Sequence, residues 1–302
     1  MNLGKVSTAL ITPFTSSGEV DVNQLQKIVE HLLQSGTESI VVNGTTAESP
    51  VLSHDEKVRV IQTVVNQVAG RVPVIAGTGS NNTAQTIAFT KEVEALGVDG
   101  CMVVAPYYNK PNQRSMIAHF TAIADAATKP LMLYNIPGRS VVNMTADTTA
   151  ELSKHANIHW MKEASGDVGQ ITQILHKSSK DFKVYSGDDG LTLPLYSIGA
   201  SGIVSVASHI VGKEMQEMIQ AFEQGNHSLA RAYHQLLQPL FDGLFTSPNP
   251  TVVKYALGKL HGFSEDVRLP LVPLSAEEKA NFDTLWAEFE EGRNKLTRTI
   301  QD

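Results

Sequence analysis

Lys162 closes a short apolar run, a position that suits a nucleophilic amine. In the run I-H-W-M-K at residues 158–162, strand alternation places Ile158, Trp160 and Lys162 on one face. A lysine inside a protein is desolvated, which lowers its pKa and frees the neutral amine that attacks a ketone to form a Schiff base. Taken alone, a lysine at a strand end more often reaches solvent or pairs with a neighbour such as Glu163.

Further polar groups follow other apolar runs and have chemistry that fits the same substrate. Tyr134 ends the preceding run, and a phenol beside an imine can move protons as general acid and base. Thr45 and Thr46 follow Gly44 in a turn whose N–H and hydroxyl donors suit a carboxylate. Arg139 follows a proline-glycine turn and can grip a carboxylate in a bidentate way. Each also has a plainer interpretation. Tyr134 could be a core residue, the threonines could cap a helix, and Arg139 could form a surface ion pair.

Metal and cofactor motifs are weak. The histidines are scattered, without the H-x-x-x-H or H-E-x-x-H spacing of a zinc site. Asp188 and Asp189 form the best remaining candidate for a divalent ion, although a turn with solvated carboxylates fits them better. The G-T-G at residues 77–79 lacks the third glycine of a dinucleotide fingerprint. We therefore expect no metal and no cofactor.

The elements that must hold these residues alternate regularly between strand and helix. Strand-like apolar runs are predicted at residues 6–11, 39–42, 72–76, 100–104, 130–135, 158–162, 182–186 and 202–206. Helical patterns follow them at residues 22–34, 55–68, 83–96, 113–126, 145–154, 168–176, 191–198 and 213–223. Near-continuous apolar strands are typical of parallel sheets buried on both faces. Eight such pairs predict an α/β fold of the (β/α)8 TIM-barrel type, with a doubly wound sheet as the alternative.

The alternation stops after residue 224. Helices are predicted at residues 226–245, 251–260 and 276–293, with no strand between them. We therefore predict a catalytic barrel over residues 1–224 and a C-terminal helical appendage over residues 225–302. In such a barrel the active site lies at the C-terminal ends of the strands, where Lys162 and Tyr134 are predicted to lie.

The composition is that of an ordinary globular protein. A net charge of −7 argues against a nucleic-acid partner, which usually meets a basic face. The chain has no apolar run long enough for a membrane span and no signal-peptide pattern at its N-terminus. Its single cysteine, Cys101, excludes an intrachain disulfide, so we expect a cytoplasmic protein.

Several motifs together resemble the pyruvate-dependent class I aldolases of the dihydrodipicolinate synthase and N-acetylneuraminate lyase family. The motifs span nearly the whole chain in order: A-L-I-T-P-F at 9–14, G-T-T-A-E-S at 44–49, Y-N-I-P at 134–137, Lys162, S-G-D-D at 186–189 and P-N-P at 248–250. Thr46, Arg139 and the P-Y-Y-N-K-P segment at 106–111 resemble the synthase branch, and the sugar-acid lyases usually lack the first two. One departure is Ala47, where many members carry glycine; it matters only if that position needs a positive φ.

The resemblance implies a lyase that joins pyruvate to L-aspartate 4-semialdehyde and gives 4-hydroxy-tetrahydrodipicolinate, on the diaminopimelate route to lysine. Lys162 would form the imine. The catalytic proton relay would comprise Tyr134, Thr45 and Tyr108, and the substrate contacts would come from Thr46, Arg139, Gly187 and Val204. Tyr108 would act in a neighbouring subunit, which implies at least a dimer and commonly a homotetramer built as a dimer of dimers.

The resemblance also implies a possible effector site at the dimer interface. His54, Asn81 and Tyr107 match the pattern of members that lysine inhibits. Lys57 and Gln85 depart from it, because the sensitive pattern has histidine and glutamate there. Compared with the sensitive pattern, a bound lysine would lose the anionic partner that Gln85 replaces and would meet the like charge of Lys57. We therefore expect weak or absent inhibition by lysine.

Two other functions remain open. A lyase of a sugar-derived 2-oxo acid would use the same Lys162 chemistry, but a polyol substrate does not need the Arg139 cation. A non-catalytic barrel that senses a 2-oxo acid is a further alternative. The presence of Lys162, Tyr134, Thr45 and Tyr108 together argues against it.

Overall fold

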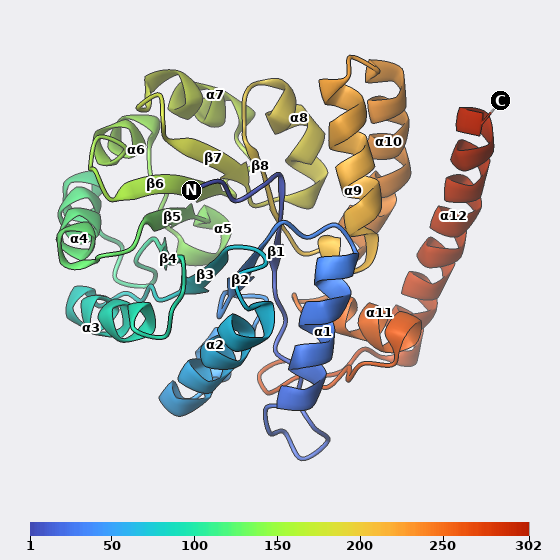
Figure 1. The fold of residues 1–302 in the computed structure, drawn as a ribbon, viewed down its shortest axis with the longest axis horizontal. Coiled ribbons are helices and arrows are strands. Elements are labelled where there is room, and N and C mark those ends of the chain that lie inside the picture. Colours follow the sequence, from blue (N-terminus) through green and yellow to red (C-terminus); the bar gives the residue numbers. More distant parts are fainter. Residues whose placement is uncertain (302) are drawn as a thin grey trace.

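The chain forms a closed barrel of eight parallel strands (Figure 1). The structure is a computed structural model, and it describes residues 1–301. The strands are β1 (Val6–Ala9), β2 (Ser39–Val42), β3 (Val74–Gly77), β4 (Gly100–Val104), β5 (Leu131–Asn135), β6 (Ile158–Glu163), β7 (Lys183–Ser186) and β8 (Gly202–Ser205). They pair in chain order, and β8 closes the barrel by pairing with β1. The predicted TIM barrel is therefore confirmed over the doubly wound sheet.

Helices follow the strands and surround the barrel (Figure 1). They are α1 (Val22–Gln34), α2 (His54–Val68), α3 (Thr83–Glu94), α4 (Gln113–Ala126), α6 (Ala146–Leu152), α7 (Val168–Lys177), α8 (Thr192–Ser197) and α9 (Ser208–Glu223). Three short turns of helix lie in the loops above the strands: η1 (Ser49–Val51), α5 (Pro137–Ser140) and η2 (Asp189–Leu191). A capping box is present at the start of α2, where Ser53 and Glu56 exchange hydrogen bonds.

The strands bury side chains on both faces, as their apolar sequences predict. One buried cluster lies inside the barrel and includes Val41, Met102, Trp160 and Tyr185 from four strands. A larger cluster lies between the strands and the helices. Trp160 and Lys162 share the inward face of β6, so the lysine lies above this inner cluster at the C-terminal end of the barrel.

Three helices follow the barrel, as predicted. They are α10 (His227–Gly243), α11 (Thr251–His261) and α12 (Ala276–Gln301), which runs well past the predicted end at residue 293. Residue 302, the last of the predicted C-terminal region, lies outside the described residues. Figure 1 shows α10 beside α9 and α12 along one edge of the molecule. Among residues 1–301, none of the helices combines the length and the hydrophobicity that a membrane span requires.

Candidate active site

The amine of Lys162 lies buried at the C-terminal end of β6. The residue is 6% exposed, and its Nζ is 4.5 Å from the centroid of the Tyr134 ring. In the strand register Lys162 pairs with Tyr134 of β5 and with Tyr185 of β7. Burial lowers the pKa of Lys162 to about 8, while the charge of Asp189 raises it and that of Arg139 lowers it. The lowered pKa raises the fraction of Lys162 in the neutral form, which imine formation needs.

Glu163 does not serve as an ion-pair partner of Lys162. Strand alternation directs its side chain to the other face of β6. There its carboxylate accepts hydrogen bonds from Nδ2 of Asn135 at 3.0 Å and from the N–H of Ser165 at 2.6 Å. The two plainer interpretations of Lys162, a solvent-exposed group and a partner of Glu163, are therefore both wrong.

Gly187 leaves the space that the Lys162 side chain occupies. A methyl group at Gly187 would lie 3.1 Å from Cε of Lys162 and 2.8 Å from Cβ of Ala164. The first distance is tight and the second is too short for real carbon atoms. Glycine after β7 therefore allows the lysine stem to extend toward the mouth of the barrel.

The phenol of Tyr134 shares this end of the barrel with Thr45. Burial raises the pKa of Tyr134 to about 12, although the charge of Arg139 and a hydrogen bond with Thr45 lower it. The phenol is thus protonated at neutral pH, and Thr45 lines the same cavity. Val204 of β8 lies in the same inner cluster as Tyr134.

The loop after β2 is folded so that two consecutive amides remain free. The N–H groups of Ala47 and Glu48 donate to the carbonyls of Gly44 and Thr45 at 3.2 and 2.9 Å. Within residues 1–301 the N–H groups of Thr45 and Thr46 have no acceptor, so they are available to an anion. Ala47 fits this loop, because the positive φ (54°) falls on Glu48 instead.

A cavity of about 620 Å³ opens above the strand ends. Its lining includes Thr45 and Tyr134, and also Arg139 of α5. A guanidinium in this wall can bind a carboxylate of a molecule held in the cavity. Thr45 and Arg139 therefore share one cavity, whereas Thr46 and Lys162 are not part of its lining; Lys162 lies behind Tyr134.

The predicted effector residues extend the same cavity away from the barrel axis. His54, Lys57, Gln85 and Tyr107 all line it. Nε2 of His54 lies 3.1 Å from the carboxylate of Glu92, an anionic group that also lines the cavity and was not among the predicted residues. Asn81 is not part of this lining, and its carbonyl accepts a hydrogen bond from Asn109 at 2.9 Å.

Tyr108 does not reach the site of its own chain. It is 88% exposed, has a φ of 73° and does not line the cavity. Within one chain the structure therefore brings together Lys162, Tyr134 and Thr45, and leaves Tyr108 on an outward-facing loop.

Asp189 is a buried part of the site that sequence reasoning missed. The predicted solvated turn holds for Asp188, which is exposed, and is wrong for Asp189, which is 2% exposed. Oδ2 of Asp189 accepts hydrogen bonds from the N–H groups of Val206 and Ala207 at 3.1 and 3.0 Å. Its Oδ1 has no partner among residues 1–301. Two adjacent aspartates carry no sequence signal that tells which one is buried.

The structure also gives no support to a divalent ion at the aspartate pair. No group of three or more metal-ligating side chains lies together anywhere in residues 1–301. The backbone N–H groups at the start of α9 satisfy one oxygen of Asp189, and its charge acts on Lys162.

A buried lysine of lowered pKa beside a tyrosine, at the C-terminal mouth of a (β/α)8 barrel, is the arrangement of a class I aldolase. The chain belongs to the dihydrodipicolinate synthetase family, whose model matches residues 2–288. The family predicted from the motifs is therefore confirmed.

Relatives of this family resemble the chain over most of its length. A 4-hydroxy-tetrahydrodipicolinate synthase of Halalkalibacterium halodurans is 54% identical over 284 residues, which covers 94% of this chain and 96% of the relative. A dihydrodipicolinate synthase structure from Bacillus anthracis has a TM-score of 0.93 at 51% identity and covers 94% of this chain and 98% of its own. A dihydrodipicolinate synthase from Cyanidioschyzon merolae with lysine bound has a TM-score of 0.93 at 44% identity, covering 95% and 98%.

Proposed function

We propose that the chain condenses pyruvate with L-aspartate 4-semialdehyde through an imine on Lys162. The product is 4-hydroxy-tetrahydrodipicolinate, on the diaminopimelate route to lysine, and the reaction is a lyase-type aldol condensation. The observation that carries the proposal is the buried amine of Lys162, 4.5 Å from the Tyr134 ring and with its pKa lowered to about 8. Relatives about 50% identical are named for the product, 4-hydroxy-tetrahydrodipicolinate, which supports this pair of substrates.

The first half of the reaction makes a nucleophile from pyruvate. The neutral amine of Lys162 attacks the ketone carbon, and the oxygen leaves as water, which gives a protonated imine. The imine draws electrons from the adjacent methyl group, so that a proton leaves and an enamine forms. The free N–H groups of Thr45 and Thr46 hold the pyruvate carboxylate, and Tyr134 moves the protons, with Thr45 beside it in the cavity wall.

The second half joins the two substrates. The enamine carbon attacks the aldehyde of the semialdehyde, and the new alkoxide takes a proton. The amine of the same substrate then attacks the imine carbon, closes the ring and releases Lys162, so that one water is produced overall. Arg139 binds the semialdehyde carboxylate from the cavity wall. Gly187, which lies against the Lys162 stem, and Val204 of β8 would contact the substrate from the strand ends.

The proposed active form contains more than one chain. Tyr108 is exposed on its own chain and belongs to the predicted proton relay, so it would complete that relay in a neighbouring subunit. We expect a homo-oligomer, a tetramer formed as a dimer of dimers. The proposed setting is the cytoplasm, where the single cysteine, buried Cys101, stays reduced.

Lysine is expected to be a weak inhibitor. Lys57 lines the cavity beside His54, and Gln85 offers no charge to an ammonium group. Glu92 is the remaining anion, and it is already paired with His54 at 3.1 Å. A lost charged partner costs about 1–3 kcal/mol, or about tenfold or more in affinity. A sub-millimolar inhibition constant in steady-state kinetics would contradict this expectation.

A coupled assay tests the substrates. Pyruvate and the semialdehyde are mixed with the protein, and the product is followed with a reductase that acts on it. Turnover of this pair, with no cleavage of N-acetylneuraminate or 2-keto-3-deoxygluconate, supports the synthase. Cleavage of either sugar acid without condensation supports the lyase alternative instead.

A further inference from the structure

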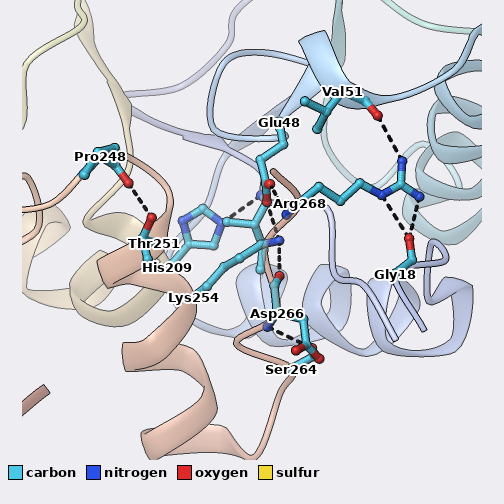
Figure 2. Close-up of polar contacts among 11 residues, drawn as sticks. Gly18, Glu48, Val51, His209, Pro248, Thr251, Lys254, Ser264, Asp266 and Arg268 are labelled. Atoms are coloured by element: carbon cyan, nitrogen blue, oxygen red, sulfur yellow. Dashed lines mark hydrogen bonds and ion pairs between the residues drawn. The ribbon is translucent and has the colours of Figure 1, made fainter. Parts of the chain in front are cut away.

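A buried ion pair links the C-terminal region to the loop that follows β2 (Figure 2). Lys254 of α11 is 0% exposed, and its Nζ donates to Oε1 of Glu48 at 2.5 Å and to the carbonyl of Asp266 at 2.7 Å. The same ammonium lies 4.2 Å from the centroid of the Phe14 ring. Glu48 is 4% exposed and lies two residues after Thr46. A mechanism through Lys162 uses neither charge, so the pair calls for another explanation.

Glu48 adopts a backbone conformation that is rare for residues other than glycine. Its φ of 54° lies in the left-handed region, which is unfavourable for a residue with a Cβ atom. Both oxygens of its carboxylate are anchored: Oε1 by Lys254 and Oε2 by the N–H of Arg268 at 3.0 Å. The side chain therefore fixes the turn that leaves the Thr45 and Thr46 amides free.

Arg268 secures the far end of the same loop. Its guanidinium donates to the carbonyl of Val51 at 3.0 Å and to that of Gly18 at 2.9 Å (Figure 2). It also makes two hydrogen bonds to the carboxylate of Glu56, at 2.5 and 2.8 Å, in the first turn of α2. The segment between α11 and α12 thus holds the loop at both ends.

Asn249 acts directly on the carboxylate-binding threonine. Its Nδ2 donates to Oγ1 of Thr46 at 3.0 Å, and both residues are buried. Because the Thr46 oxygen already accepts a hydrogen bond from Asn249, its own O–H proton is free to point to an anion. The segment before α11 therefore orients a substrate contact.

Stability alone does not explain a buried ion pair. The cost of desolvating two charges often exceeds their attraction, and well-packed apolar residues can replace such a pair without loss of stability. A buried pair is best explained where it fixes one arrangement of the backbone. Here the fixed arrangement is the loop with free amides at Thr45 and Thr46.

We propose that Lys254, Glu48 and Asn249 are positioning residues that hold the loop of Thr45 and Thr46 in the shape that binds the pyruvate carboxylate. This inference rests on the proposed function. It assigns to the C-terminal helical region a role in binding the first substrate. Because pyruvate forms its imine and releases water before the aldehyde reacts, a displaced loop should impair the pyruvate step more than the aldehyde step.

The test uses full-length variants and steady-state kinetics with both substrates. Lys254→Met breaks the pair, and the double variant Glu48→Gln/Lys254→Met removes both charges, so that no lone charge stays buried. Asn249→Ala removes the bond to Thr46 without any change of charge. Lys259→Met is the matched control: it lies on the same helix, but its partner at 2.6 Å is Asp283 of α12.

The parent protein must first give a borohydride-trapped pyruvate adduct on Lys162, and its absence overturns the proposed function itself. With that adduct present, we expect kcat/KM for pyruvate to fall about tenfold or more in the double variant and in Asn249→Ala. We expect kcat/KM for the semialdehyde to change less than about twofold, and Lys259→Met to leave both constants within that range. An equal fall for both substrates, or no fall for pyruvate in Asn249→Ala, overturns the positioning role.

Discussion

Replacing Lys162 by methionine should stabilise the folded chain at neutral pH, because it removes a buried ionisable group. Methionine is long and unbranched, so it fills the same space without a charge. Burial lowers the pKa of Lys162 from its ordinary value of 10.5 to about 8. Each pKa unit corresponds to about 1.4 kcal/mol, so the folded chain is destabilised by about 3 kcal/mol when this lysine is protonated.

The gain depends on pH in a defined direction. Below about pH 8 the lysine is protonated in both states, so the full cost is present and Lys162→Met gains most. Between about pH 8 and pH 10.5 the unfolded chain binds a proton that the folded chain does not. The stability contributed by the neutral lysine therefore rises with pH, and the advantage of the variant shrinks over this window.

Urea unfolding followed by circular dichroism measures this effect at several pH values from 7 to 10. Lys183→Met is the control, since Lys183 begins the neighbouring strand β7 with an exposed side chain. We expect a gain in stability for Lys162→Met that declines as the pH rises, and a small pH-independent change for the control. A loss of stability at pH 7, or a gain that does not vary with pH, would show that the buried charge of Lys162 does not destabilise the fold.

Three substitutions test the remaining roles. Arg139→Leu should raise KM for the semialdehyde by about ten- to hundredfold and leave the pyruvate adduct intact, since one charged partner is lost; loss of the adduct would contradict this. Gly187→Ala should lower kcat/KM for pyruvate by about a hundredfold, because the added methyl would lie 3.1 Å from Cε of Lys162 and would displace the lysine side chain. Near-normal kinetics would show that the Lys162 side chain has room for the methyl. Asp189→Asn removes a charge that raises the pKa of Lys162, so the acidic limb of the pH profile of kcat/KM for pyruvate should move to lower pH. If that limb does not move, the charge of Asp189 does not act on Lys162 in the pH range of the assay.

Much of the barrel could be predicted from local sequence, and so could the place of Lys162. The change from an apolar run to an amphipathic pattern marks in the sequence where each strand ends. A polar residue at the C-terminal end of such a strand lies at the mouth of the barrel. The neighbouring position of Tyr134 follows from the order of the strands, because β5 and β6 pair side by side.

The rest depended on contacts between distant segments. The burial of Asp189 depends on amides at the start of α9, and nothing in its own dipeptide indicates them. The partner of Glu48 is Lys254, more than two hundred residues later in the chain. The pairing of His54 with Glu92 joins two helices whose facing sides are set by the closed barrel. Such pairs follow from tertiary packing, which periodicity in one segment cannot reveal.

Every step of the proposed reaction depends on an imine between Lys162 and pyruvate. The protein is incubated with pyruvate and reduced with borohydride, and the modified residue is located by peptide mass spectrometry. We expect one adduct, on Lys162, that is lost in Lys162→Met. No adduct in the parent protein, or an adduct on the other buried lysine, Lys254, would contradict it.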